Sequence, residues 1–165
     1  MTALMPVATR IELAERDAPL NAPIVAAVDA SAASRAAVEE AVILADELDV
    51  PLVFVYVRRG PAGFFGAPAY QRRLTKEMER GRRVLDRALR VADVAEVEAE
   101  AEILEGSPRR RIVEFARDRG AQLIVVGTRR RRFGRSVACG VARAADRPVL
   151  VATPLSSRPA LARAA

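Results

Sequence analysis

The chain has 165 residues, of which 51% are hydrophobic and only 4% aromatic, and its formal net charge is +6 at pH 7. The chain has no histidine and one cysteine, and this composition excludes histidine-based catalytic triads, the usual metal sites and an internal disulfide framework. No apolar run approaches the ~20 residues of a membrane helix, and the first residues lack the apolar core of a signal peptide, so we expect one globular domain in the cytoplasm.

The charge is unevenly spread along the chain. From residue 107 to the end there are 14 arginines and three acidic residues, a net charge of +11, while the rest carries 13 basic and 18 acidic residues, a net charge of −5. Such asymmetry is typical of an anion-binding half. The alternative is a compositional bias, because every basic residue except Lys76 is an arginine.

Strands and helices alternate in the first half of the chain. The apolar run at 24–28 predicts a strand, and Ser31 is placed to cap a helix that continues to Leu48. A second strand is expected at 52–57, followed by a loop and an amphipathic helix at about 71–91. Neither strand shows polar alternation, as expected for parallel strands that are covered on both faces.

The second half continues the same order. Glutamates alternate with apolar residues at 97–103, which predicts a half-buried strand at a sheet edge, with its glutamates in solvent. A helix is expected to begin at Ser107, as N-cap, and to end near Gly120. Two further apolar strands, at 122–126 and 148–152, flank a short helix.

This alternation predicts an α/β fold, an open and Rossmann-like parallel sheet of five strands with helices on both faces. We expect one domain at 23–153, with a flexible arm at 1–22 and a flexible tail at 154–165. Ligands of such sheets bind beyond the carboxyl ends of the strands, where the strand order switches. The chemistry is therefore expected at the strand ends, which are Asp29 to Ser31, Val57-Arg58, Glu105-Gly106 and Gly127-Thr128.

Several short motifs stand at these strand ends and helix starts, in a fixed order. They are Val28-Asp29-Ala30-Ser31, Val55-Tyr56-Val57, Glu105-Gly106-Ser107-Pro108, Leu123-Ile124-Val125-Val126-Gly127-Thr128-Arg129 and Arg147-Pro148-Val149-Leu150-Val151. Together they resemble the universal stress protein family over residues 23–153. The resemblance implies a sheet of order 3-2-1-4-5, of the adenine-nucleotide alpha-hydrolase-like type. It also implies stress-related regulation by ligand or partner binding.

The resemblance further implies a homodimer, since in this family the last strand commonly pairs with its twin. Here that strand comprises Val149, Leu150, Val151 and Ala152. Its apolar character and its place at the end of the strand order are typical of a pairing edge.

One branch of the family binds ATP and another does not, so ATP with Mg²⁺ is the candidate cofactor. Asp29 matches a residue that contacts the nucleoside in ATP-binding relatives, while Val57 and Val126 match positions that line the adenine pocket. Each residue also has a structural alternative. Asp29 could bond a turn amide, Val57 and Val126 could be plain core residues, and Gly127 could be required by its turn. The full candidate nucleotide site is Asp29, Ser31, Val57, Val126, Gly127, Arg129, Arg130, Gly134 and Ser136.

The phosphate loop departs from the pattern of the ATP binders, which is Gly, two residues, Gly, nine residues, then Gly with Ser or Thr. Gly127 matches the first glycine, but Arg130 stands at the second, and Gly140 is not followed by Ser or Thr. Counting back from Pro148 instead places Ser136 at the serine position, so the loop is shortened. These departures argue against binding of phosphates by an ordinary glycine loop. The alternative is a nucleotide that Asp29, Gly127 and the arginines hold in an altered pose.

The arginine run from Arg129 to Arg132, with Arg135, supports a second hypothesis. These guanidinium groups could clamp phosphates or form an electropositive surface for nucleic acid or an acidic protein. Nucleic acid is disfavoured because Phe133 is the only aromatic residue nearby. A solvated charged loop is the structural alternative.

Catalytic chemistry has little support in the sequence. Cys139 is expected to pack as a small apolar side chain on the last helix. The sequence shows no nucleophile–base pair, metal cluster or carboxylate pair at catalytic spacing. We therefore expect a binding protein rather than an enzyme, with weak nucleotide hydrolysis left open.

Overall fold

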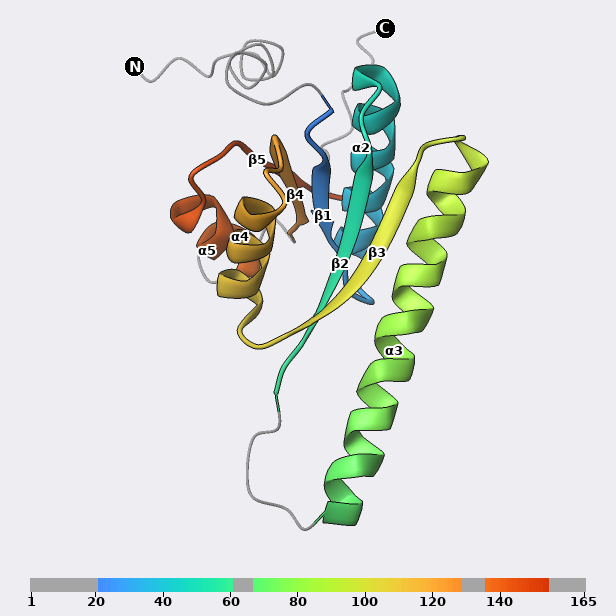
Figure 1. The fold of residues 1–165 in the computed structure, drawn as a ribbon, viewed down its shortest axis with the longest axis vertical. Helices are drawn as coiled ribbons and strands as arrows, with labels where there is room; N and C mark the ends of the chain where they lie inside the picture. The colour runs from blue at the N-terminus through green and yellow to red at the C-terminus, as the bar shows by residue number, and fades with distance from the viewer. Residues whose placement is uncertain (1–20, 61–66, 129–135, 155–165) are drawn as a thin grey trace, which may run out of the picture.

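The computed structural model describes residues 21–60, 67–128 and 136–154, which form one parallel sheet with helices packed against both faces (Figure 1). The strand order is β3-β2-β1-β4-β5, which confirms the predicted order 3-2-1-4-5. The elements are β1 (Ile24–Ala27), α2 (Ala32–Leu48), β2 (Leu52–Arg58), α3 (Ala67–Val94), β3 (Ala99–Glu105), α4 (Pro108–Asp118), β4 (Leu123–Gly127), α5 (Val137–Ala144) and β5 (Val149–Ala152).

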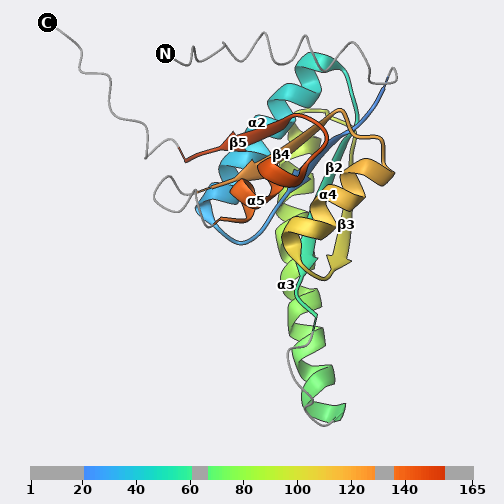
Figure 2. The same cartoon turned by 90° about the vertical axis from the view of Figure 1, so that its left-hand side faces the viewer.

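Two apolar layers hold the sheet between the helices. Figures 1 and 2 show α2 and α3 on one side of the sheet and α4 and α5 on the other. In β2, Phe54 and Tyr56 belong to the layer under α2 and α3, whereas Val53 and Val55 belong to the layer under α4 and α5. Because β2 is covered on both faces, all of its inner residues are apolar, which explains the absence of polar alternation.

The edge strand β3 carries exposed glutamates, two of which pair with an arginine that follows α4. It begins two residues later than predicted and continues to Glu105, but its edge position confirms the prediction. The glutamates are exposed, as expected, and two of them also pair with an arginine. Arg119, just after α4, donates to Glu100 (3.2 Å) and Glu102 (2.6 Å). The guanidinium also lies over the ring of Phe115, so α4 is joined to the sheet edge.

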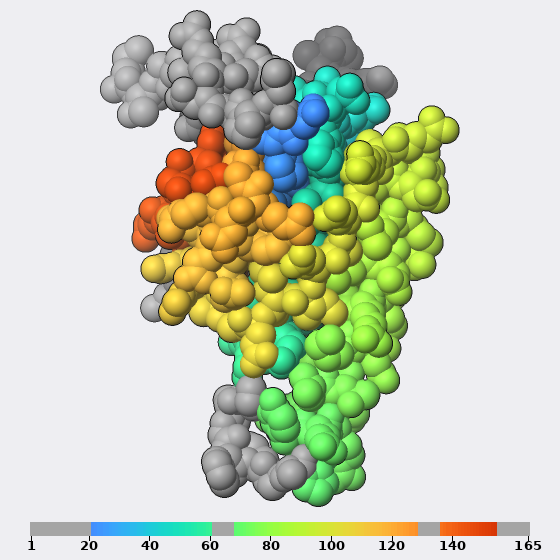
Figure 3. Space-filling model, in the orientation of Figure 1, coloured from blue at the N-terminus to red at the C-terminus, as the bar shows by residue number. Residues whose placement is uncertain are grey.

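Helix α3 is longer than its periodicity predicts, by about a turn at its start. Its first half extends beyond the sheet, so it is exposed on most sides (Figures 1 and 3). Its second half packs closely on the sheet at Gly81, where an added Cβ would lie 2.8 Å from Cδ1 of Tyr56 and 3.2 Å from Cδ1 of Ile103. That contact fixes the distance between α3 and β2.

Arg147, just before β5, joins that strand to α4 at the end of the sheet where the strands begin. Nη1 of Arg147 donates to the carbonyl oxygens of Ala116 (3.1 Å) and Ala121 (2.5 Å), and Nε donates to Asp146. Asp146 also accepts from Arg117 (3.1 Å). The two arginines lower the pKa of Asp146 to about 2.

Some expectations lie outside the described residues. The arm at 1–22 and the tail at 154–165 fall almost wholly in this part of the chain, and the domain at 23–153 remains a proposal. Within the described ranges, the model contains no helix that is long and apolar enough to cross a membrane.

Candidate functional site

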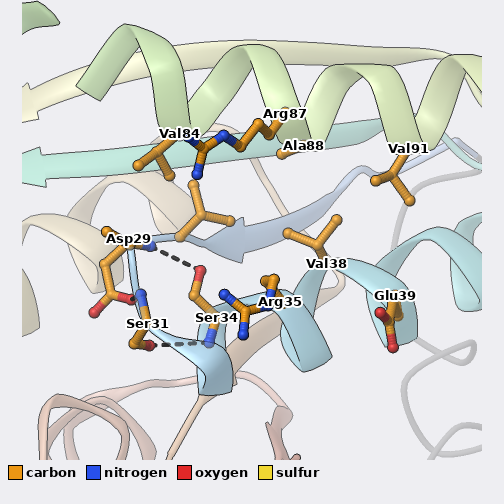
Figure 4. Close-up of a pocket in the computed structure, with 12 residues that line it drawn as sticks. Asp29, Ser31, Ser34, Arg35, Val38, Glu39, Val84, Arg87, Ala88 and Val91 are labelled. Atoms are coloured by element: carbon orange, nitrogen blue, oxygen red, sulfur yellow. Dashed lines mark hydrogen bonds between the residues drawn. The ribbon is translucent and has the colours of Figure 1, made fainter. Parts of the chain in front are cut away.

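The turn between β1 and α2 is held by three hydrogen bonds (Figure 4). The Ser31 amide donates to Oδ1 of Asp29 (2.7 Å), the Asp29 amide donates to the buried hydroxyl of Ser34 (2.8 Å), and the Ser34 amide donates to Oγ of Ser31 (3.1 Å). Ser31 is therefore the N-cap of α2, as predicted. Asp29 does bond a turn amide, yet its carboxylate remains exposed and aims away from the core.

Gly127 ends β4 beside this same turn. An added Cβ would overlap the carbonyl group of Ala33 and would lie 2.8 Å from the amide nitrogen of Ser34. The predicted reason for this glycine, the backbone conformation of the turn, was wrong, since the positive-φ glycines of the described chain are Gly106 and Gly120. Gly127 is needed because the first turn of α2 lies directly on the end of β4.

The carboxyl ends of β1, β2 and β4 surround a cavity of about 240 Å³, which we call the strand-end cavity. The predicted residues Asp29, Ser31, Val57, Val126 and Gly127 all line it. They come from three strand ends and the turn after β1, so residues about a hundred positions apart in the sequence share one wall. The fold thus brings these candidates together, and their role in binding is a separate question.

Three helices begin at this cavity. Ser31 and Ser34 lie at the start of α2, Pro108 is the first residue of α4, and Val137 and Ala138 are the first residues of α5. The first amides of a helix lack partners within the helix and carry the positive end of its dipole. Three such ends facing one cavity favour an anionic ligand.

The hydroxyl of Ser107 leaves one of these helix starts open. Ser107 is the N-cap of α4 in backbone conformation, as predicted, but its side chain makes no capping hydrogen bond. In contrast, Ser136 accepts from the Cys139 amide (3.2 Å) and caps α5. The predicted Ser136 is therefore occupied as a cap and does not line the cavity.

Other candidates have different outcomes. Gly140 lies inside α5, where an added Cβ would meet the side chain of Arg109, so it serves helix packing and no phosphate loop. Cys139 is buried, as expected for a small apolar side chain. Arg129, Arg130 and Gly134 lie outside the described residues and remain predictions.

Sequence reasoning missed several residues of this cavity, namely Ser34, Arg59, Pro108, Ile112, Val137 and Ala138. Ser34 and the first residues of α4 and α5 were visible as helix starts. Their convergence was not visible, because it depends on how the helices cross the sheet.

A smaller cavity, of about 140 Å³, lies between α2 and α3 on the other side of the same turn (Figure 4). Its walls are mostly apolar, from Val38, Val84, Ala88 and Val91, and Arg35 and Arg87 stand at its rim. It does not reach the end of β4, so the strand-end cavity is the better candidate. Among the described residues, no group of three or more Cys, Asp or Glu residues could hold a metal ion.

Comparison with known proteins agrees with this geometry. The family model for the universal stress protein family matches residues 21–153. The chain belongs to the universal stress protein family. Universal stress protein MJ0531 of Methanocaldococcus jannaschii is 36% identical over 108 residues, which cover 64% of this chain and 63% of that protein. The chain thus spans under two thirds of the length of this curated relative.

Solved structures of family members match the fold over most of their length. A universal stress family protein from Burkholderia pseudomallei is 30% identical, with a TM-score of 0.67, over 80% of this chain and 96% of that one. A universal stress protein from Archaeoglobus fulgidus in complex with dAMP is 26% identical, with a TM-score of 0.66, over 81% of this chain and 99% of that one.

Proposed function

We propose that this protein is a universal stress protein-type regulator that binds an adenine nucleotide in the strand-end cavity. The observation that carries the proposal is the convergence of three helix N-termini on a cavity with apolar walls and a carboxylate at its edge. The dAMP complex of the Archaeoglobus fulgidus relative supports the choice of an adenine nucleotide. We class the protein as a binding protein rather than an enzyme.

The side chains suit the parts of a nucleoside. Val57 and Val126 offer apolar contact to the faces of a purine. Asp29 uses Oδ1 to hold the turn, and no described residue donates to Oδ2, so Oδ2 can accept a ribose hydroxyl. Asp29 is the only acidic residue of the described chain that lines this cavity.

The size of the cavity indicates where the phosphates go. At about 240 Å³ it is smaller than the ~300–1,000 Å³ of common small-molecule sites, so it fits the base with part of the sugar. The phosphates then lie at the helix starts, where the first turn of α5 offers its amides. Where Mg²⁺ accompanies ATP, it is bound mainly by phosphates and water, with few protein ligands.

Calorimetry with ATP tests this function directly. Protein stripped of nucleotide is titrated with ATP and Mg²⁺ at physiological salt, and we expect micromolar binding. Asp29→Ala should weaken it by roughly tenfold to a hundredfold, since a hydrogen bond to a charged group contributes about 1.5–3 kcal/mol. Asp86→Ala, which changes an exposed aspartate on α3, is the matched control. No binding at millimolar ATP would refute the proposal and direct attention to Arg129–Arg135 as a partner surface.

We also propose a homodimer that pairs through β5. This strand is at the end of the strand order, and Val149, Leu150 and Val151 stay partly exposed although they are apolar. Pairing with a second copy would cover them and the free edge. Light scattering at micromolar concentration should give twice the mass of the chain, and Leu150→Arg should halve it. A wild-type monomer at that concentration would contradict the dimer.

A further inference from the structure

Helix α3 has two faces with different roles. Its inner face packs on the sheet, where Gly81 and Leu85 are buried. Where the first half of the helix extends beyond the sheet, the same side lines a cleft of about 370 Å³ beside the end of β2, which we call the α3 cleft. The outer face is exposed along the length of the helix, which forms one flank of the molecule (Figures 1 and 3). The outer face therefore contributes little to the packing of the fold.

The outer face carries a row of basic residues, Arg72, Lys76, Arg83, Arg87 and Arg90, all of them exposed. They follow one another at intervals of four, seven, four and three residues. Because successive residues of a helix turn by ~100°, these intervals keep the five side chains within a sector of ~60°. The row extends over ~27 Å, at a rise of ~1.5 Å per residue. We call it the basic stripe.

The basic stripe has little compensating negative charge. Helix α3 as a whole contains eight basic and four acidic residues, a net charge of +4. Within the stripe, Nη1 of Arg83 lies 4.0 Å from Oε2 of Glu79, at the limit of an ion pair. In the described parts of the chain, the other four residues of the stripe form no ion pair with a carboxylate. The stripe therefore faces solvent with almost its full charge.

Folding does not account for the basic stripe. Arg72 with Lys76, and Arg83 with Arg87, are like charges four residues apart, and such pairs destabilise a helix. Glutamates in alternation with the arginines would solvate the same face equally well, and they would add stabilising pairs. A row of cations that lack partners favours an anionic ligand.

We propose that the basic stripe binds duplex nucleic acid through its phosphate backbone. A duplex carries one negative charge per ~1.7 Å of its axis, so a row of cations of ~27 Å meets phosphates along its whole length. Arginine and lysine both bind phosphates, and these contacts carry no sequence information. The stripe contains no aromatic residue on which the bases of a single strand would stack, and this composition favours a duplex.

An anionic membrane fits α3 less well than a duplex does. A helix that lies on a membrane buries its apolar face among the lipids. The apolar face of α3, which includes Val84, Leu85 and Ala88, is already buried in the layer between the helices and the sheet. Only the charged face remains for a partner, and its charge alone is the feature that a phosphate backbone recognises.

Fluorescence anisotropy with a labelled DNA duplex of about 20 base pairs tests the proposal on the full chain. We expect micromolar binding at about 50 mM salt, and a slope of log K against log salt near −4, since each phosphate contact contributes about −0.9. Arg72→Gln, Lys76→Gln and Arg90→Gln should each make this slope shallower by about 1 and weaken binding by roughly tenfold at about 0.1 M salt. Glutamine has a similar helix propensity, so far-ultraviolet circular dichroism should show an unchanged fold.

Two controls separate the basic stripe from other basic parts of the chain. Arg143→Gln removes an exposed arginine from α5, on the other face of the sheet, and should leave the affinity for the duplex unchanged. The double variant Arg130→Gln/Arg131→Gln removes charge from the arginine run. In that background, Arg72→Gln should still weaken duplex binding by the same factor as in the wild type.

Four results would overturn the proposal. The first is an absence of duplex binding at about 100 μM protein and about 50 mM salt. The second is an equal loss of affinity in Arg143→Gln and Arg72→Gln. The third is binding that is lost in the double variant of the arginine run and unchanged in the variants of the stripe. The fourth is tighter binding to phosphatidylserine vesicles or to polyglutamate than to the duplex.

The test is independent of nucleotide binding. No residue of the basic stripe lines the strand-end cavity, so each of these outcomes has the same meaning whether or not that cavity binds ATP.

Discussion

The strand-end cavity and the α3 cleft are built in opposite ways. The first is formed by strand ends, helix starts and small residues, and its geometry is locked by contacts such as that of Gly127 with α2. The second is formed mainly by long charged side chains on the end of one strand and one face of a helix. Residues of the first site therefore serve folding as well as binding, whereas the second includes exposed side chains, such as Arg59 and Arg80, whose removal should cost little stability.

This difference is tested most severely at Gly127. Gly127→Ala should lower the free energy of unfolding by about 2–3 kcal/mol or more, because the added methyl overlaps the backbone of α2. The counterpart between β2 and α3, Arg80→Ala at an exposed position, should change it by less than about 0.5 kcal/mol. Urea denaturation measures both. Equal stability of the two variants would remove the basis of the comparison.

Ser34 tests whether the turn near Asp29 is part of the core. Ser34→Ala should cost about 1–2 kcal/mol, because it leaves the Asp29 amide without its acceptor in a mostly buried position. Thr75→Ala is the control, since this exposed hydroxyl bonds only to the carbonyl oxygen of Gln71 within α3. Thermal unfolding of the pair should show the larger drop for Ser34; a loss as large in the Thr75 variant would argue against a special role of the turn.

Gly81 packs tightly against β2, where α3 meets the sheet. Alanine there gains about 1 kcal/mol of helix propensity but loses about 1–3 kcal/mol by pressing on Tyr56. We expect a net loss of about 1 kcal/mol and a shift of the Tyr56 ring signal. A more stable variant with an unchanged ring signal would mean that the packing of α3 on β2 is looser than the structure shows.

The smallest effect is expected at Asp146, which lies just before β5, where the strands of the sheet begin. Because its pKa is lowered to about 2, its ion pairs with Arg117 and Arg147 stabilise the fold above the ordinary pKa near 3.8, and this contribution is lost as the pH falls through 2. The difference between wild type and Asp146→Asn should stay under about 1 kcal/mol, since the carboxylate is largely exposed. Denaturation at intervals of about one pH unit between pH 6 and pH 2 should show that this difference in stability becomes smaller. A difference that stays constant over this range would contradict the assignment.

The sequence predicted the sheet well because its inner strands are continuously apolar and each ends at a turn signal. It predicted Asp29, Val57 and Gly127 as neighbours because parallel strands end at one edge, and the family resemblance added Val126. It did not predict the full length of α3, whose first half is polar on most sides.

Long-range pairing was harder to foresee. Arg119 bonds to Glu102 and Glu100, which lie 17 and 19 positions earlier in the sequence, and no local sequence pattern predicts these contacts. The convergence of three helix starts has the same origin, since it depends on the crossing of each helix over the sheet. Gly127 was expected to be required by the backbone of its turn, whereas the structure shows that a side chain there would clash with the first turn of α2.

The most direct test of the account is to locate a bound nucleotide by NMR, with methyl-labelled valine and leucine. With ATP present, the adenine protons should give nuclear Overhauser effects to the methyl groups of Val57 and Val126, and none to Leu74 in the α3 cleft. That pattern would establish the strand-end cavity as the nucleotide site. Contacts to Leu74 instead, with none to Val126, would place the nucleotide between β2 and α3 and contradict this assignment.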